Sequence, residues 1–337
     1  NQYCNSDCTI IDYAVGKAGD LHKWLDNKAS FVLGIDLSKD NINNINDGAC
    51  IRYIRQIKKM KDKPKNTYIF IEGNTGKKIN NNFGKSNYEF AEGNKISEDI
   101  IDHITGIKKS AFTNMPQYGI VKNGFDLGTI QFSLHYMFEN KTMINNFIWN
   151  CCKTIKLNGY LIGTCYDGEL VYDLLKNNKL NETNELHIDG SKIWHIKKKY
   201  KNNENFINQS DPCGYKIGVF QDSINTENDE YLVHFKYFER LMIDYGFKLI
   251  HMTSFETYYN DYKKKLSKEE SKKKLSKEEK KISFLNKAFV FEKINEIDPN
   301  LVYNYNTNEK KEETKELLVT SKPVKLKTKI ILNNYTL

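Results

Sequence analysis

No stretch of this 337-residue sequence approaches the roughly 20 consecutive apolar residues that a membrane-spanning helix requires. A signal peptide is also missing from its start. These absences argue against a membrane protein or a secreted one, and we expect an intracellular protein without a membrane partner. The first residue is not methionine, which indicates a domain taken from a longer polypeptide.

The seven cysteines lack the pattern of a disulfide framework or of a complete metal site. Cys4 and Cys8 have the spacing of half a metal site, but no second pair of Cys or His completes it. The other five are isolated or adjacent in the chain: Cys50, Cys151, Cys152, Cys165 and Cys213. We therefore expect no bound metal and reduced thiols throughout, as is usual inside the cell.

Apolar residues make up 39% and charged residues 28% of the chain, which is typical of a globular protein with one substantial core. The net charge of +8 favours a polyanionic partner. Part of this charge lies in a duplicated sequence, KKKLSKEE, at residues 263–270 and 272–279. Its charge density indicates a solvated helix, and the alternative is contact with an RNA backbone.

Strand-like and helix-like segments alternate through the first half of the chain, which predicts a parallel α/β sheet. The expected strands there are residues 8–15, 31–36, 68–72, 125–132 and 160–164. We predict helices from about residue 20, over 98–109 and over 143–155. Further along, the expected elements are antiparallel strands at 185–196 and 215–220, a helix at 231–245, and strands at 248–253 and 287–292.

The first strand, a turn of small residues, a helix and a second strand ending in a carboxylate form the arrangement that a nucleoside cofactor requires. The turn, GKAG at residues 16–19, can bring backbone amides close to a ligand at a helix N-terminus. Asp36 ends the second strand about 20 residues beyond the turn, where it can accept both hydroxyls of a ribose. The spacing alone fits NAD as well as S-adenosylmethionine.

Residues 11–24, IDYAVGKAGDLHKW, resemble the first motif of the mRNA cap guanine-N7 methyltransferases, L-D-L-G-C-G-K-G-G-D-L-x-K-W. The sequence departs from this motif at Ala14 and Ala18, where the family usually has glycine. A methyl group at Ala14 is compatible with a cofactor above it if φ is negative. The resemblance implies S-adenosylmethionine as the cofactor.

The resemblance also implies which residues hold this cofactor. Asp12 and Lys17 would hold its methionine part, and Gln131 would lie near the sulfonium. The adenine contact falls on Asn74, where the family often has Asp, or on Glu72 if the register slips. The full expected set is Asp12, Ala14, Gly16, Lys17, Asp36, Leu37, Asn74, Gln131 and Tyr136.

Residues 125–139, FDLGTIQFSLHYMFE, resemble a second family motif, F-D-x-x-x-x-Q-F-x-x-H-Y-x-F-E. Recognition of a guanine requires a stacking surface and groups that pair with the base edge. Phe132 and Tyr136 would supply aromatic surfaces, and His135 a donor to O6. Each residue alone would be interpreted as part of the core, but the joint motif favours guanine binding.

Three later segments complete the predicted cap site. Glu230, in DEYLV at residues 229–233, resembles the family carboxylate that accepts from N1 and N2 of guanine. Tyr166 stands where the family has Pro and would line the base pocket. Residues 288–293, AFVFEK, match the last family strand, but Asn286 replaces the Tyr that often closes over the guanine. This substitution puts the aromatic lid in doubt.

The triphosphate bridge of a cap requires cations, and Lys23 and Arg52 are the candidates. Arg52 is followed by a tyrosine, much as in an Arg-Tyr pair of the family. The alternative for each side chain is simple solvation at the surface. Because guanine N7 is already an unprotonated nucleophile, we expect no general base and catalysis by positioning.

The resemblance implies a Rossmann-like class I fold: a mostly parallel seven-stranded sheet flanked by helices, with an antiparallel insertion near the cap. We expect the methyltransferase domain over residues 1–293, with insertions at 74–123 and 185–222 and a charged helical run at 261–282. Residues 294–337, rich in Lys, Glu and Asn, are expected to form a C-terminal appendage.

The implied substrate is the capped 5′ end of mRNA, GpppN. The sequence has no K-x-D-G motif for forming a covalent GMP adduct, so we expect triphosphatase and guanylyltransferase modules upstream in the same polypeptide. Participation of an accessory subunit is left open. The Asn, Lys and Ile bias suggests a large DNA virus, working in the host cytoplasm or the virion. The alternatives are a methyltransferase for another RNA and a catalytically silent RNA-binding or regulatory subunit of a capping enzyme.

Overall fold

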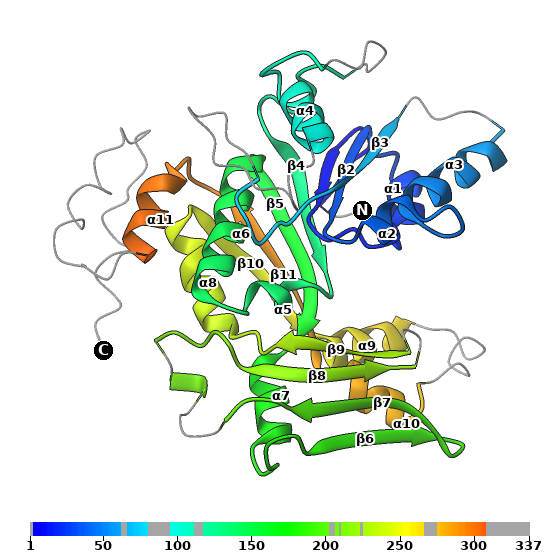
Figure 1. The fold of residues 1–337 in the computed structure, drawn as a ribbon, viewed down its shortest axis with the longest axis vertical. Coiled ribbons are helices and arrows are strands. Elements are labelled where there is room, and N and C mark those ends of the chain that lie inside the picture. Colours follow the sequence, from blue (N-terminus) through cyan, green and yellow to red (C-terminus); the bar gives the residue numbers. More distant parts are fainter. Residues whose placement is uncertain are drawn as a thin grey trace.

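The computed structural model describes residues 3–61, 66–79, 95–110, 117–201, 206–208, 210–222, 225–265 and 275–307. These residues form two β-sheets, and helices pack against both faces of the larger one (Figure 1). The smaller sheet lies beyond the C-terminal end of strand β5 (Figure 1).

The larger sheet has seven strands in the order β10-β11-β5-β4-β1-β2-β3. Its strands are β1 (Thr9–Asp12), β2 (Phe31–Asp36), β3 (Thr67–Glu72), β4 (Phe125–Gln131), β5 (Ile155–Tyr166), β10 (Phe247–Ser254) and β11 (Asn286–Lys293). The first five run parallel, whereas β11 is antiparallel to both of its neighbours. The mostly parallel sheet and the fold class predicted from the sequence are confirmed.

Both faces of this sheet are covered, which explains why its strands are nearly continuous apolar runs. In β2, every residue except Asp36 is buried. Successive residues of a strand point to opposite faces, and accordingly Ile10 and Ile11 of β1 belong to different core clusters.

One core cluster joins the sheet to α4 (Lys95–Ile104), α6 (Lys141–Thr154), α8 (Phe235–Asp244) and α11 (Pro299–Thr307). The other joins it to α1 (Leu21–Asp26), α2 (Lys39–Asn43) and α3 (Ala49–Lys59). The short helix α5 (Leu134–Met137) follows β4 directly. These helices leave the carboxyl ends of the parallel strands as the edge where ligands bind in such folds.

The smaller sheet is antiparallel, in the order β6-β7-β8-β9. Its strands are β6 (Thr183–Ile188), β7 (Ser191–Lys198), β8 (Lys216–Gln221) and β9 (Thr226–Tyr231). One face shares a third core cluster with α7 (Gly168–Leu175) and the short 3-10 helix η2 (Phe206–Asn208). This antiparallel part is wider than the predicted insertion at 185–222.

Several predicted boundaries differ from the structure. Strand β5 begins eleven residues before Tyr166, at Ile155, and passes through a turn-like Asn158 with φ of 63°, where we predicted a break after the helix. The helix predicted over 231–245 begins only at Phe235, because Tyr231 still pairs in β9 with Lys216. Of the predicted insertion at 74–123, residues 80–94 and 111–116 lie outside the described part.

The C-terminal appendage prediction needs correction for residues 299–307. They form α11, whose Val302 is 2% exposed in the main core. The indole of Trp149 also donates a hydrogen bond of 3.0 Å to Asn300 Oδ1. The segment itself carries no charged residue; the charged residues further along the chain concealed its buried Pro299 and Val302. Residues 308–337 lie outside the described part.

The charged run at 261–282 is helical at both of its ends. Its first residues belong to α9 (Phe255–Lys265) and its last residues to α10 (Lys277–Ser283). Ser276 and Glu279 form a reciprocal capping box that starts α10. Residues 266–274, between the two helices, lie outside the described part.

A further correction concerns Cys4 and Cys8, which we expected to be reduced and which form a disulfide. Their four-residue separation, taken for half a metal site, is compatible with this pairing because both lie in a tight turn before β1. Within the described ranges, no group of three His, Cys, Asp or Glu side chains could hold a metal ion. No described helix is long and apolar enough to cross a membrane.

Candidate active site

The carboxyl ends of four adjacent parallel strands bring most of the predicted site residues to one edge of the sheet. Asp12 ends β1, Asp36 ends β2 and Gln131 ends β4. The strand order reverses beside β1, which pairs with both β2 and β4. Such a switch point is where α/β sheets bind nucleoside ligands.

The turn after β1 approaches the end of β2 through its backbone. Gly16 has a φ of 53°, and its amide donates a hydrogen bond of 2.7 Å to Asp36 Oδ2. Glycine adopts this φ at no steric cost. The condition set for Ala14 is met, because its φ is negative, whereas Ala18 has a φ of 55°. The turn therefore keeps the expected shape with two alanines in place of glycine.

The carboxylate of Asp36 organises this half of the site. Its Oδ1 accepts from the amide of Ser38 at 2.9 Å and from the side chain of Asn41 at 3.0 Å. With the Gly16 amide on Oδ2, three of about four acceptor positions are occupied. The carboxylate is thus fixed in orientation and retains capacity for a ligand hydroxyl. Ser38 and Asn41 were not predicted; the helix N-cap pattern after Asp36 was their only signal.

Asp12 is a buried carboxyl without a cationic partner in contact. It is 3% exposed, and its Oδ1 accepts from the amide of Ala14 at 3.1 Å. Burial raises its pKa from 3.8 to about 8, and the negative charges of Asp20 and Asp36 act in the same direction. A cation placed beside Asp12 would restore its charged form.

The two predicted lysines lie differently from expectation. The ammonium of Lys17 is paired with Asp47 at 2.7 Å and with Asp40 at 3.7 Å, so in this structure it turns toward α2. Lys23 is paired with Asp20 at 2.6 Å, and its charge is among those that act on Asp12. Lys23 therefore lies within electrostatic range of Asp12.

Arg52 lies in a cationic pocket between α1 and α3. Its guanidinium donates a hydrogen bond of 2.9 Å to the carbonyl of Lys17. The pocket has a volume of about 180 Å³ and is lined by Ala18, Leu21, His22, Arg52, Arg55, Gln56 and Lys59. Arg55 and Lys59 were missed in the sequence, although their spacing of three and seven residues from Arg52 places them on one helix face.

Glu230 and His135 form the most unusual pair of the site. Glu230 comes from β9 and His135 from α5, and they are 9% and 5% exposed. Oε2 of Glu230 lies 3.6 Å from Nδ1 of His135, too far for a hydrogen bond. Both this Oε2 and Nε2 of His135 are buried without any hydrogen-bond partner. Buried polar atoms of this kind are costly unless a ligand satisfies them.

Both members of this pair are held neutral by burial. The pKa of His135 is lowered from 6.5 to about 3, and that of Glu230 is raised from 4.5 to about 8. At neutral pH the pocket therefore offers an uncharged imidazole and a carboxyl close to its titration point. Its chemistry suits a ligand edge that carries both donors and acceptors.

Aromatic side chains stand beside this pair. The rings of His135 and Tyr136 are 4.2 Å apart, and Tyr136 is 41% exposed. Burial raises the pKa of Tyr136 to about 12, with contributions from the charges of Glu230 and Asp36. Tyr136 thus lies within electrostatic range of both halves of the site.

Phe132 has an uncommon conformation at the end of β4. It is 54% exposed and has a φ of 50°, although it is a bulky residue. Its amide is held by a hydrogen bond of 2.7 Å to the carbonyl of Thr164. Strain of this kind persists where the surroundings enforce it and is frequent at functional sites.

Four predicted residues have local partners that take up their polar groups. The side-chain amide of Gln131 donates a hydrogen bond to the hydroxyl of Thr129 and accepts one from the hydroxyl of Thr164, both within the sheet. Asn74 accepts from the amide of Gly76 at 2.9 Å, so it shapes the turn after β3. The other two of these four, Tyr166 and Asn286, are paired across strands β5 and β11. Leu37, which was also predicted and has no polar side chain, is 60% exposed next to Asp36.

Tyr166 and Asn286 do not present the groups that were expected of them. The hydroxyl of Tyr166 accepts from Trp194 at 3.1 Å and from Gln221 at 3.2 Å, which ties it to the smaller sheet. The Asn286 amide donates to the carbonyls of Ile282 and Ser283, where it caps the end of α10. Asn286 is 6% exposed and does not replace the missing aromatic lid.

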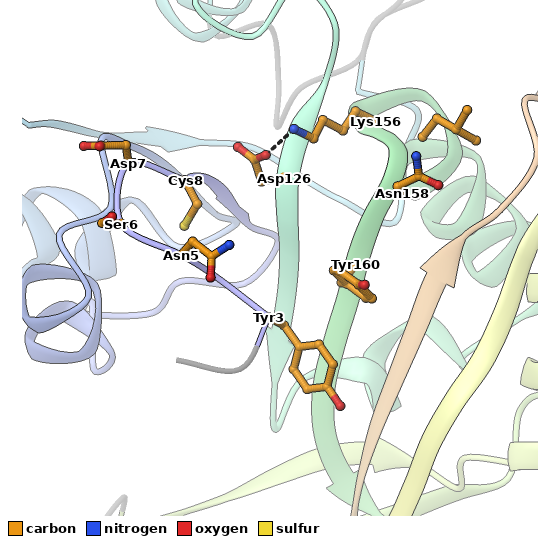
Figure 2. Close-up of a pocket in the computed structure, with 10 residues that line it drawn as sticks. Tyr3, Asn5, Ser6, Asp7, Cys8, Asp126, Lys156, Asn158 and Tyr160 are labelled. Atoms are coloured by element: carbon orange, nitrogen blue, oxygen red, sulfur yellow. Dashed lines mark ion pairs between the residues drawn. The ribbon is translucent and has the colours of Figure 1, made fainter.

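A separate pocket of about 390 Å³ lies at the opposite edge of the sheet, where β1 and β4 begin (Figure 2). Asp126 forms an ion pair with Lys156 across it and accepts from the amide and hydroxyl of Thr9. The polar groups of Asp126 are thus satisfied within the fold. The pocket lies apart from the site described above.

The family model for the mRNA (guanine-N(7))-methyltransferase domain matches residues 1–316. The chain is 25% identical over 272 residues to a probable mRNA-capping enzyme of Acanthamoeba polyphaga mimivirus, covering 79% of this chain and 21% of that protein. It is 27% identical over 277 residues to the mRNA cap guanine-N(7) methyltransferase of Debaryomyces hansenii, covering 80% of this chain and 48% of that protein. The chain thus spans less than half the length of these relatives.

Among solved structures, an S-adenosylmethionine-dependent methyltransferase from Clostridium acetobutylicum is similar over 86% of both chains. The TM-score is 0.47 and the sequence identity is 12%.

Proposed function

Since this chain belongs to the family of mRNA (guanine-N(7))-methyltransferase domains, we propose that it transfers a methyl group from S-adenosylmethionine to N7 of the guanine cap of mRNA. The observation that carries the proposal is the buried pair Glu230 and His135, with one unsatisfied polar atom on each side chain. A guanine edge supplies both partners at once.

The residues at the carboxyl edge of the larger sheet fit the cofactor. S-adenosylmethionine supplies an electrophilic methyl group on a sulfonium. Asp36 keeps acceptor capacity for a ribose hydroxyl, and Gly16 leaves open space beside its backbone. Asp12 is a buried carboxyl whose raised pKa would be relieved by the cationic methionine end. We assign Asp12, the turn from Ala14 to Lys17, Asp36 and Leu37, and Asn74 to this half.

The guanine pairs with the opposite half of the site. Its N1–H and N2–H donate to Glu230, and these two bonds favour the ionised carboxylate over the neutral form of the empty pocket. O6 accepts from His135 in the tautomer protonated at Nε2. This tautomer is available because burial keeps His135 neutral. Phe132 and Tyr136 supply the aromatic surfaces, and Tyr166 and Asn286 support the wall beneath them. Uncharged groups and one carboxyl thus read the base edge.

Rate acceleration in this site comes from placing the two reactants, because N7 carries no proton to remove. Alignment at about 3–3.5 Å can lower the barrier by roughly 7–11 kcal/mol. Positive charge moves onto the guanine during transfer, and the carboxylate of Glu230 stabilises it through N1 and N2. Tyr136 and Gln131 orient the reacting groups between the two halves. Lys23 and Arg52 neutralise the triphosphate.

The direct test uses S-adenosylmethionine labelled in its methyl group and RNA carrying a GpppA cap. Digestion of the product should release label as 7-methylguanosine. Label in uncapped RNA would instead indicate a methyltransferase for another RNA. Binding of capped RNA without any transfer would indicate a silent capping subunit. Each of these two results would overturn the proposal.

We further propose that the chain is the methyltransferase module of a longer capping enzyme that acts in the host cytoplasm or the virion. The support is its match to 21% of a mimivirus protein named a probable mRNA-capping enzyme. An intact polypeptide with guanylyltransferase and triphosphatase modules would form a covalent adduct with labelled GMP. Absence of the adduct from the intact polypeptide would contradict this arrangement.

A further inference from the structure

A stripe of aromatic side chains, exposed except for the half-buried Phe255, leads away from the guanine half of the site. The rings of Phe132 and Phe255 meet edge to face, with centroids 6.1 Å apart. Phe255 begins α9, and Tyr258 and Tyr262 follow three and seven residues later, on the same side of the helix. Tyr258 and Tyr262 are 44% and 61% exposed. Phe132, Phe255, Tyr258 and Tyr262 are called the aromatic stripe.

Helix α9 is anchored to the fold by a neighbouring ring on the same helical face. That anchor is Tyr259, whose ring packs at 5.5 Å from Phe284 at the end of α10. The helix also contacts β10 and β11. Tyr258 and Tyr262 lie on the flank of this face away from Tyr259. The Tyr258 hydroxyl is within 3.0 Å of Nε2 of His251, but both rings remain exposed. Contiguous exposed apolar surface of this kind indicates an interaction site.

Basic residues continue the stripe beyond its last ring. Lys263 and Lys264 directly follow Tyr262, and both side chains are exposed. The ammonium of Lys263 lies 5.3 Å from the ring of Tyr259. These lysines begin the duplicated basic sequence of a chain with net charge +8. Exposed rings next to lysines are the combination that binds single-stranded nucleic acid, through base stacking and phosphate contact.

We propose that the aromatic stripe binds the first nucleotides of the transcript beyond its cap, as single-stranded RNA. The inference rests on the proposed function, because Phe132 connects the stripe to the guanine site. From Phe255 to Tyr262 the helix rises about 10 Å. This length matches about three stacked nucleotides at roughly 3.4 Å each. Stacking accepts any base, as a cap enzyme that acts on many transcripts requires.

The first test measures binding without any methyl transfer. A fluorescent, uncapped, single-stranded 12-nucleotide RNA is titrated with the full chain and with the double variant Tyr258→Ala/Tyr262→Ala. We expect affinity to fall about 30-fold, from roughly 1 kcal/mol for each of two lost stacking contacts. The variant Tyr258→Phe/Tyr262→Phe should bind like the original chain. Tyr118→Ala, which removes another exposed ring at 47% exposure, is the matched control.

The second test compares methylation of the GpppG dinucleotide with that of a capped 12-nucleotide RNA. The double alanine variant should raise KM only for the long substrate and leave kcat unchanged for both. Thermal unfolding of each variant verifies that it is folded. Equal effects on both substrates, or equal RNA affinity of the alanine and phenylalanine variants, would overturn the proposal. A chain that binds RNA through the stripe but methylates no cap would contradict the proposed function alone.

Discussion

Oε2 of Glu230 and Nδ1 of His135 lie 3.6 Å apart in a pocket where each side chain keeps one buried polar atom unsatisfied. Glu230 comes from strand β9 of the smaller sheet and His135 from helix α5, 95 positions apart in the sequence. Neither forms the ion pair that a carboxylate and an imidazolium would, because burial keeps both neutral at neutral pH. The fold thus holds recognition groups ready for a partner that it does not itself contain.

Glu230→Ala should lower kcat/KM for a GpppA-capped RNA by at least about 100-fold, since Glu230 accepts from the base and stabilises the charge that develops on it. Affinity for S-adenosylmethionine, measured by calorimetry, should stay nearly unchanged. Asp229→Ala is the matched control, because the next carboxylate along β9 faces Lys199 and Lys216 on the other side. Methylation by Glu230→Ala at the original rate would contradict the assignment of Glu230 to guanine recognition.

The stability of the ligand-free protein should fall as pH rises from about 6.5 to 8. Asp12 and Glu230 both have pKa values raised to about 8, so the folded state binds protons that the unfolded state has released. Their stabilising effect is complete at acid pH and is lost as pH rises through 8. The lowered pKa of His135 acts oppositely, but only below its unfolded value of 6.5.

Melting temperature recorded against pH tests this dependence. The double variant Asp12→Asn/Glu230→Gln should flatten the curve between pH 6.5 and 8. Asp244→Asn is a control, because the pKa of Asp244 is raised only to about 6 and its effect is complete below this window. A slope that survives in the double variant would contradict the assignment of these two groups.

Asp36→Ala should weaken binding of S-adenosylmethionine by about 10- to 100-fold, the usual loss for hydrogen bonds to a charged group. The variant also removes the acceptor of the Gly16 amide, so the turn itself loosens. Asp36→Asn separates the two effects, since its side-chain oxygen can still accept one of these bonds. Calorimetry gives the affinity, with the exposed Asp26→Ala as a control. Unchanged affinity in Asp36→Ala would remove Asp36 from the site.

The sequence predicted those parts of the fold and site that depend on strand ends. The pattern of β2 placed Asp36 at the ligand edge, and the parallel order of the strands placed Asp12 and Gln131 beside it. Local apolar patterns were sufficient here because a parallel sheet is buried on both faces.

The sequence was less informative about side-chain partners. Lys17 matches a family motif, yet its ammonium pairs with Asp47, thirty residues away in a turn that has no distinctive pattern. Asn286 similarly bonds to two carbonyls of α10 that only the fold brings near. Such contacts follow from tertiary geometry, and a single sequence does not encode them locally.

Phe132→Ala should raise KM for capped RNA about 5- to 100-fold, through loss of a stacking surface worth roughly 1–3 kcal/mol per base. Its effect on stability should be small, since the ring is 54% exposed and the φ of 50° is strained for any side chain. Phe132→Tyr preserves the ring and should keep the original KM. Steady-state kinetics and thermal unfolding measure the two effects. An alanine variant with unchanged KM would exclude stacking on this residue.

Asn286→Ala tests whether this position contacts the base at all. The side chain is buried and donates to Ile282 and Ser283, so its removal leaves two carbonyls at the end of α10 unpaired. We expect a loss of about 1–3 kcal/mol in unfolding free energy, measured by urea denaturation, and no change in KM for capped RNA. Asn286→Asp, which keeps the size but loses both donors, should show the same separation. A rise in KM without loss of stability would show that Asn286 contacts the base, because only a contact with the substrate lowers affinity while leaving the fold intact.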